Sequence, residues 1–423
     1  GRRSPARGQA VARINPMIFH RSSAHPLRAV RALGCAVLMA LAPGLSTHAE
    51  EAAVAKTAPR SVSDIVALLA RYPLEPGRAE RLRAALAEPE PRGASRADLR
   101  AYHLRRLQAA KEAGAVDIRI ESARKVVEIG GNLESRGYDM GQVLFAELEG
   151  GSSAAALERI KSILSFGSGL LGQNVNVRVL QAIAHISLGD TEAAARSIQE
   201  AERFHASYRF ESWWPAYRYT YDKLIAQARA RLLIRQGKYE EAEAAMRKAI
   251  EAGIADIGTV SIKVANQQGP AFEYEHFVDL SRADLARILV LQGRLNDAEL
   301  VAREALLSVI ARFGGQSSQA AYVLVAMTQV LQEQGRFAEA VQLGTLAVRA
   351  FEAAGAVPDA EFLLLARQSL AAAHVARASY DAALLEYGKI FDAFAANPEV
   401  QSRAAGGSAG WALLTPEQGE TVA

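Results

Sequence analysis

The amino-acid sequence predicts an all-α protein, an α-solenoid of about six to seven antiparallel helical hairpins. Three observations support this fold class. A ladder of small residues recurs at intervals of 38 to 56 residues along the chain. Half of the residues are apolar but only 7% are aromatic, a composition that suits close-packed helices. No alternation of apolar and polar residues is long enough to predict a sheet.

Each copy of the ladder places small residues on one face of a helix that follows a turn. Alanine comes five positions after a small turn residue, and two further members come four and seven positions after that alanine, on the same helix face. The turn residues are Gly151, Gly189, Gly237, Gly293, Gly335 and Ala378, and the alanines are Ala156, Ala194, Ala242, Ala298, Ala340 and Ala383. The last two members are Ile160 and Ile163, Ile198 and Ala201, Met246 and Ala249, Ala302 and Ala305, Gly344 and Ala347, and Tyr387 and Ile390. We therefore expect paired helices that approach closely, in hairpins that contact only their neighbours along the chain.

The first 49 residues have the pattern of an export signal. Met17 is the expected translation start, so residues 1–16 are interpreted as an upstream or non-native segment. Arginines after Met17 precede an apolar run, Ala32–Leu45, and a small-residue cleavage site ends at Ala49. The run of 14 residues is shorter than the roughly 20 that a membrane span needs. We predict a signal peptide over residues 17–49, cleaved near Ala49, and a periplasmic or secreted bacterial protein without a membrane span after cleavage.

The charge and cysteine content of the mature chain argue against several function classes. Residues 1–49 hold seven arginines and no Lys, Asp or Glu, so cleavage changes the net charge from +3 to −4. A mildly acidic chain without a basic stripe argues against nucleic acid as a partner. Cys35 is the only cysteine and lies in the signal, so the mature chain has no thiol for a disulfide, a nucleophile or a metal ligand.

The mature chain is expected to have three parts. Residues 50–94 comprise a leader helix, over residues 61–86 with Ser61 or Ser63 as its cap, and a Pro/Gly linker. The repeat solenoid follows over residues 95–395. Residues 396–423 are a loose tail in which a further helix starts at Trp411. The last hairpin has only this tail to cover its apolar residues, so we expect self-association through the C-terminal hairpin or a longer chain.

No motif for catalysis, cofactor binding or metal binding is found in the sequence. There is no G-x-S-x-G nucleophile elbow, and the glycines near Gly167 are not followed by the G-K-[ST] of a phosphate loop. His185 and His374 share a repeat position but are far apart along a solenoid, and no histidine pair has helical metal-ligand spacing with an acidic partner. We therefore predict a protein that is not an enzyme and that binds no cofactor or metal.

The hairpins resemble the tetratricopeptide repeat. The best copies are IRQGKYEEAEAAMRKAIEAG (Ile234–Gly253), VLQGRLNDAELVAREAL (Val290–Leu306) and QEQGRFAEAVQLGTLAVRAF (Gln332–Phe351). Turn-to-turn spacings of 42 and 43 residues exceed the family's usual length of about 34 and are similar to the longer, kinesin-light-chain-like variety. The family's tryptophan in the first helix and its closing proline are missing. The resemblance implies a scaffold that binds a protein or peptide in a concave groove.

The resemblance also implies which residues face a partner, because the first helices of such hairpins line the groove. The groove candidates are Asn176, Gln227, Arg231, Arg235, Arg287, Tyr322, Gln329 and Gln368. Arg231 and Arg287 both lie six residues before a turn, so we expect them to stack and to grip a carboxylate or an acidic peptide. The family's Lys and Asn clamp for a C-terminal carboxylate has no counterpart here. A plain solvated groove is the alternative interpretation.

A dense aromatic patch interrupts the repeats between residues 204 and 223. Its candidate contact residues are Trp213, Trp214 and Tyr217, next to Phe210, Tyr219 and Tyr221. One interpretation is packing on the neighbouring hairpin, with Ser212 as the cap of a long helix and Pro215 in its first turn. The other interpretation is a stacking surface for a peptide.

Two alternatives to a plain scaffold remain open. In bacteria, long repeats of this type often precede a caspase-like peptidase domain of the CHAT family, so the chain is alternatively the N-terminal repeat region of such a protein. The Cys/His pair of that domain is absent from these 423 residues. The second alternative is an envelope-assembly factor, which should show an acylated cysteine or an operon of partners.

Overall fold

The computed structural model describes residues 58–72, 77–130, 133–149, 152–165, 173–259 and 271–397. The chain divides into two units, residues 1–49 and residues 50–423, and every described residue belongs to the second unit. The predicted signal peptide, the glycines near Gly167, the turn residue Gly151 and the tail with Trp411 lie outside the described residues.

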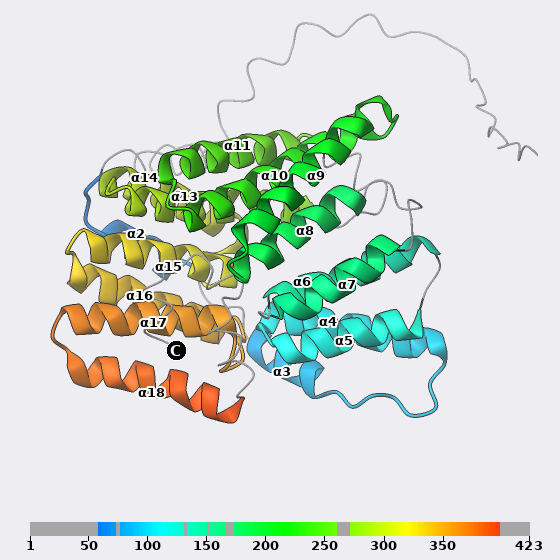
Figure 1. The fold of residues 1–423 in the computed structure, drawn as a ribbon. Coiled ribbons are helices and arrows are strands. Elements are labelled where there is room, and N and C mark those ends of the chain that lie inside the picture. Colours follow the sequence, from blue (N-terminus) through cyan, green and yellow to red (C-terminus); the bar gives the residue numbers. More distant parts are fainter. Residues whose placement is uncertain are drawn as a thin grey trace, which may run out of the picture. The chain divides into compact units, whose positions relative to one another are not determined.

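The described residues form helices and turns, and none of them lies in a strand (Figure 1). Two short helices come first, α2 (Ser63–Ala70) and α3 (Arg78–Ala87). Antiparallel hairpins follow: α4 (Arg96–Ala113) with α5 (Val116–Ile129), α6 (Leu133–Glu149) with α7 (Ser153–Ser165), α8 (Gln173–Ser187) with α9 (Thr191–Ser207), α10 (Trp214–Arg235) with α11 (Tyr239–Ile257), α13 (Ala271–Leu291) with α14 (Leu295–Phe313), α15 (Ser318–Glu333) with α16 (Phe337–Ala353), and α17 (Glu361–Ala376) with α18 (Tyr380–Ala396). A short 3₁₀ turn, η1 (Tyr208–Phe210), precedes α10. The predicted all-α solenoid of helical hairpins is confirmed.

The turns of the hairpins lie where the ladder places them. The turn residue has a positive φ at Gly189, Gly237, Gly293 and Gly335, and also at Ala378, where φ is 56°. In each of these turns the N–H that follows the turn residue donates to a carbonyl five residues earlier, at 2.9 Å in all five copies. This is the Schellman closure of a helix, and it satisfies a carbonyl that the helix end leaves free. Ala378 adopts it despite its Cβ, which confirms it as the turn residue of the last copy.

Most positions of the ladder are buried, and Ile163 and Tyr387 are half-buried. Ala156, Ala194, Ala242, Ala298 and Ala340 are fully buried, and Ala383 is 2% exposed. At Gly344 an added Cβ would lie 3.3 Å from Leu370 Cδ1 and 3.4 Å from Leu370 Cα. Small residues therefore set the distance between helices both within a hairpin and between successive hairpins.

The predicted leader helix over residues 61–86 is wrong in one respect, because the structure has two helices there. Gly77, with a φ of 72°, precedes α3, and the sequence has prolines at positions 73 and 76. Left-handed glycine and proline both interrupt a helix. The cap of α2 is Val62, which makes no side-chain capping bond, while the Ser61 hydroxyl accepts from the Ser63 N–H at 3.2 Å.

Two contacts depart from the expectation that each hairpin contacts only its neighbours. In the first, Val62, Ile65 and Leu69 belong to the same apolar cluster as the helices from α10 to α18. In the second, the α4–α5 turn meets the start of α17: Val357 N–H donates to Ala113 O at 2.9 Å. Asn397 Nδ2 also donates to Asp117 Oδ2 at 2.6 Å. Segments far apart in the sequence therefore close against each other within the described unit.

Candidate peptide-binding surface

The structure places all of the predicted groove candidates on the first helices of hairpins. Asn176 is on α8, Gln227, Arg231 and Arg235 are on α10, Arg287 is on α13, Tyr322 and Gln329 are on α15, and Gln368 is on α17. Consecutive first helices pack against each other, since α13 contacts α15 and α15 contacts α17. Residues at one repeat position are therefore brought together across hairpins.

Arg287 is the centre of a polar network that joins α13 to α15. Its Nη1 donates to Asp284 Oδ1 at 3.0 Å and to the Tyr322 hydroxyl at 2.7 Å, and its Nε donates to Gln329 Oε1 at 3.0 Å. The Tyr322 hydroxyl in turn donates to Asp284 Oδ1 at 3.0 Å. Gln329, like Arg287, lies six residues before a turn, so this position stacks between consecutive repeats.

Asp284 was not among the sequence candidates, although it is the anionic partner of Arg287. The signal that could have identified it is its spacing, because residues three apart on a helix lie on the same face. Phe362 on α17 is a second contact that sequence reasoning missed. Its ring meets the Tyr322 ring edge-on, with centroids 5.2 Å apart.

The alternative interpretation, a plain solvated groove, does not hold for three of the candidates. Arg287 is 8% exposed, Tyr322 9% and Gln368 7%. Arg235 is exposed, and Asn176, Gln227, Arg231 and Gln329 are half-buried. The burial follows from the close approach of the first helices, which brings the side chains of one repeat onto those of the next. Arg287 consequently has a partner in Asp284 before any ligand is considered.

Buried polar atoms of the candidates that have no hydrogen-bond partner among the described residues include Arg287 Nη2, Arg231 Nε and Asn176 Oδ1. Leaving such an atom buried and unpartnered costs roughly 1–3 kcal/mol. Two of these atoms are guanidinium donors on the first helices of consecutive hairpins, α10 and α13, so the surface has unused capacity to bind an anionic acceptor.

At neutral pH the Tyr322 hydroxyl keeps its proton and the Arg287 guanidinium keeps its charge. Burial raises the pKa of the Tyr322 hydroxyl to about 12, so it remains a donor at neutral pH. Burial by itself lowers the pKa of Arg287, but Tyr322 and Asp284 outweigh it and raise that pKa above the ordinary value. The charge of Arg231 acts to lower the pKa of Tyr322, which places the α10 guanidinium within electrostatic reach of the network.

The aromatic patch is largely engaged within the fold. Trp213 contacts Tyr208 and Tyr217, with ring centroids 5.3 Å and 6.1 Å away, and Trp214 contacts His205 at 4.3 Å. Burial lowers the pKa of His205, so burial favours its neutral form. Phe210 differs, because 83% of it is exposed.

The predicted cap of the helix that carries the patch is wrong. Trp213 is the N-cap of α10 and makes no side-chain capping bond, so Ser212 does not serve as the cap. Pro215 lies in the first turn of the helix, as expected.

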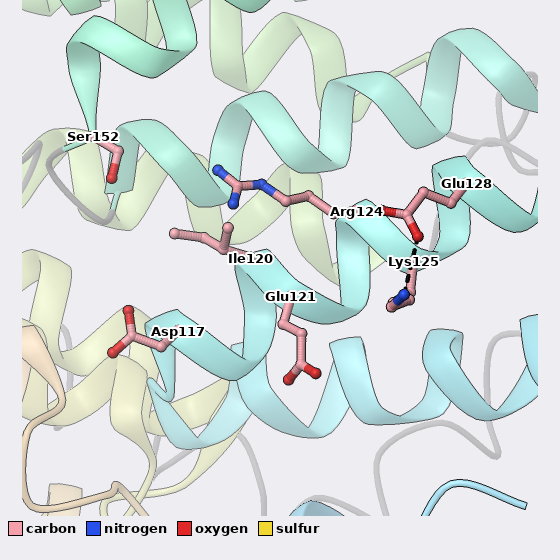
Figure 2. Close-up of a pocket in the computed structure, with 7 residues that line it drawn as sticks. All are labelled: Asp117, Ile120, Glu121, Arg124, Lys125, Glu128 and Ser152. Atoms are coloured by element: carbon pink, nitrogen blue, oxygen red, sulfur yellow. Dashed lines mark hydrogen bonds and ion pairs between the residues drawn. The ribbon is translucent and has the colours of Figure 1, made fainter.

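Two further surface pockets are lined by none of the groove candidates. One, of about 290 Å³, is lined by Asp117, Ile120, Glu121, Arg124, Lys125, Glu128 and Ser152 (Figure 2). Its charges are of mixed sign and pair internally or nearby: Lys125 with Glu128 at 3.0 Å, and Arg124 with Glu147 at 2.9 Å. The other, of about 380 Å³, is lined by Arg178, Glu200, Arg203, Phe204 and Ser207. Neither lining indicates one class of ligand.

Within the described ranges, no group of three or more His, Cys, Asp or Glu side chains is arranged to hold a metal ion. In the same part of the chain, no helix combines the length and the apolar character that a membrane crossing requires.

Comparisons with solved structures find helical proteins of low sequence identity. BtubC (BKLC) from P. vanneervenii is 16% identical, with a TM-score of 0.37, over 70% of this chain and 91% of that chain. A Rap protein complexed with Competence and Sporulation Factor is 12% identical, with a TM-score of 0.44, over 77% of this chain and 92% of that chain. A signal transduction ATPase with a tetratricopeptide repeat sensor from Pyrococcus horikoshii is 11% identical, with a TM-score of 0.42, over 78% of this chain and 49% of that chain.

A sequence comparison with family models points to one repeat type. No curated protein matches the chain. The model described as tetratricopeptide repeat matches residues 225–252, which span the turn between α10 and α11. Repeats of this type form scaffolds for protein interactions. The match identifies a tetratricopeptide repeat at α10–α11, and the same hairpin and turn recur along the described residues.

Proposed function

We propose that this protein is an exported, non-catalytic scaffold that binds an acidic peptide segment of a partner protein along the first helices of its hairpins. The observation that carries the proposal is a pair of buried guanidinium donors, Arg231 Nε and Arg287 Nη2, that have no acceptor among the described residues. Carboxylates of a ligand would supply acceptors for these donors, and bonds between charged groups are about twice as strong as neutral ones.

The composition of the surface supports an acidic ligand over a basic one. Asp284, the anion of the network, already accepts from Arg287 and from Tyr322. The cations Arg231 and Arg235 lie on one helix, α10, and neither forms an ion pair with another described residue. A basic peptide would find its acceptor occupied, whereas an acidic peptide would find donors.

Binding can be tested with the mature chain from Glu50 and labelled peptides of equal length, one rich in Asp and Glu and one in which these are amidated. We expect the acidic peptide to bind more tightly, and Arg231→Ala to weaken its binding about tenfold. Arg229→Ala is the matched control, because Arg229 is exposed on the same helix and pairs with Glu202. Equal binding of the two peptides, or no effect of Arg231→Ala, would refute the proposal.

Export is supported by the signal pattern of residues 17–49 and is tested separately. Protein recovered from the periplasm or medium of an expressing bacterium should begin at Glu50. A cytoplasmic protein that retains residues 17–49 would contradict it.

Self-association through the C-terminal hairpin is supported by the exposed side chains of α18. Leu384 is 67% exposed, Leu385 62% and Phe391 61%. Sedimentation of the chain at tens of micromolar should show a dimer that Leu384→Glu converts to a monomer. A monomer in which these apolar side chains of α18 stay exposed to solvent would instead favour one of the alternatives. These are the repeat region of a larger CHAT-type protein and an envelope-assembly factor.

A further inference from the structure

The second helices carry a polar cluster that holds the segment before α2. We call it the docked cluster; its members are Glu299 and Arg303 on α14, Gln334 and Arg336 at the turn, and Glu339 on α16. Arg303 Nη2 donates to the backbone oxygens of Arg60 at 2.6 Å and of Ser61 at 3.0 Å. Arg336 also donates to Arg60 O.

The docked cluster also accepts bonds from the segment and binds its carboxylate. The N–H of Val62 donates to Glu339 Oε1 at 3.0 Å, and the N–H of Arg60 donates to Glu299 Oε1 at 3.3 Å. Arg303 Nη1 donates to Asp64 Oδ1 at 3.2 Å. Most of these bonds are to backbone atoms, so the cluster recognises an extended chain that enters a helix with an acidic residue in its first turn.

A second cluster of the same design lies one repeat earlier. We call it the open cluster; its members are Glu243 and Arg247 on α11, Gln292 and Arg294 at the α13–α14 turn, and Asp297 on α14. Glu243 and Arg247 follow Gly237 at the same spacing as Glu299 and Arg303 follow Gly293. Around the next turn, Gln292, Arg294 and Asp297 are spaced from Gly293 as Gln334, Arg336 and Glu339 are from Gly335. The two clusters are therefore repeats of one motif.

The internal bonds of the two clusters match. Arg247 Nε donates to Glu243 Oε1 at 2.9 Å, as Arg303 Nε does to Glu299 Oε1 at 2.9 Å. Arg294 bonds Glu243 at 2.7 Å and Asp297 at 2.8 Å. In the docked cluster, Arg336 makes the corresponding bonds to Glu299 at 2.8 Å and to Glu339 at 2.6 Å.

The two clusters differ in what covers them. The side chain of Arg303 is fully buried by the docked segment, whereas the equivalent Arg247 side chain is 48% exposed. Arg294 is likewise 44% exposed, against 18% for Arg336. Among the described residues, Arg247 and Arg294 donate to side chains and no backbone carbonyl accepts a hydrogen bond from either.

We propose that the open cluster is a second docking site, which binds a partner segment with the chemistry of residues 60–65: two consecutive backbone carbonyls followed by an acidic residue in the first turn of a helix. The occupied copy in the same molecule shows how such a segment sits. Arg247 would take the role of Arg303, donating to the carbonyls and to the acidic side chain. Asp297 would accept the backbone N–H that Glu339 accepts from Val62. This site lies on the second helices of hairpins. It is separate from the proposed peptide-binding surface with Arg231 and Arg287, which lies on the first helices.

The peptide of residues 58–72 is the probe, titrated into the mature chain, whose own segment fills the docked cluster. We expect binding at concentrations up to about 1 mM, weakened about tenfold or more by Arg247→Ala. An Asp64→Asn peptide should also bind more weakly. Arg196→Ala is the matched control and should leave binding unchanged, because Arg196 makes a similar exposed pair with Glu192 on the second helix α9.

Two outcomes would overturn the proposal. The first is that the peptide does not bind the mature chain at these concentrations. The second is binding that Arg247→Ala leaves unchanged, which would place the peptide elsewhere, including in exchange with the chain's own segment on the docked cluster.

Discussion

Arg336 Nη1 lies 2.8 Å from Glu299 Oε2, so a charged hydrogen bond joins the second helices of consecutive hairpins. One repeat earlier, Arg294 bonds Glu243 in the same way at 2.7 Å. In both copies a glutamine two residues before the arginine also donates to a backbone oxygen of the preceding second helix, Gln334 to Leu295 and Gln292 to Tyr239. The repeats are thus held together by polar bonds at the turns as well as by the buried ladder.

Arg303→Met should destabilise the protein by about 3–5 kcal/mol, because it leaves the buried Glu299 without one of its charged partners. Arg247→Met changes the equivalent residue of the open cluster, which is 48% exposed, and should cost about 1 kcal/mol or less. Urea denaturation midpoints of both variants test the difference. Equal shifts would mean that docking of residues 60–64 contributes nothing to stability.

Ala298→Leu and Ala340→Leu should each destabilise by about 1–3 kcal/mol through overpacking between paired helices. Both alanines are fully buried. Ala338→Leu, at an exposed position on the same helix as Ala340, is the control and should change little. The measurement is the denaturation midpoint, and a neutral result at both buried sites would contradict the assignment of the ladder to helix contacts.

Gly114→Ala should destabilise more than Gly335→Ala. Both glycines have a positive φ, which costs an alanine about 1–2 kcal/mol. At Gly335 the added Cβ has no atom within 4 Å, but at Gly114 it would lie 2.7 Å from Ala360 Cβ. The difference between the two melting temperatures therefore measures the contact of the α4–α5 turn with α17. Identical losses would show that this contact does not form in solution.

Stability should depend on pH through Glu339. The hydrogen bond from Arg336 is the main cause that lowers the pKa of this carboxyl below its ordinary value of 4.5, and the Val62 N–H adds to it. A group whose pKa is lower in the folded state stabilises above its unfolded pKa, and the contribution is lost as the pH falls through the folded value. The stability difference between wild type and Glu339→Gln should thus be constant above pH 4.5 and shrink below it. Melting temperatures across this range check it; a difference that grows on acidification would contradict it.

The turns and the ladder could be predicted from the sequence because they are local. A glycine, or Ala378, ends one helix by its own backbone conformation, and alanine at fixed offsets marks the face against which the paired helix packs. Arg287 and Gln329 lie at the same repeat position, six residues before a turn, and the structure joins them by a hydrogen bond at 3.0 Å.

Only the tertiary structure decided which polar residues are buried and which segment docks on which hairpin. Arg303 bonds Asp64, 239 positions earlier, and Asn397 bonds Asp117, 280 positions earlier. No local period encodes such pairs, because they depend on how the successive hairpins are oriented. For the same reason the sequence alone placed Arg287 in a groove open to a partner, whereas the approach of α15 buries it against Tyr322. The sequence by itself determined the hairpin and its spacing, and the accumulated packing of hairpins determined which of their surfaces stayed open.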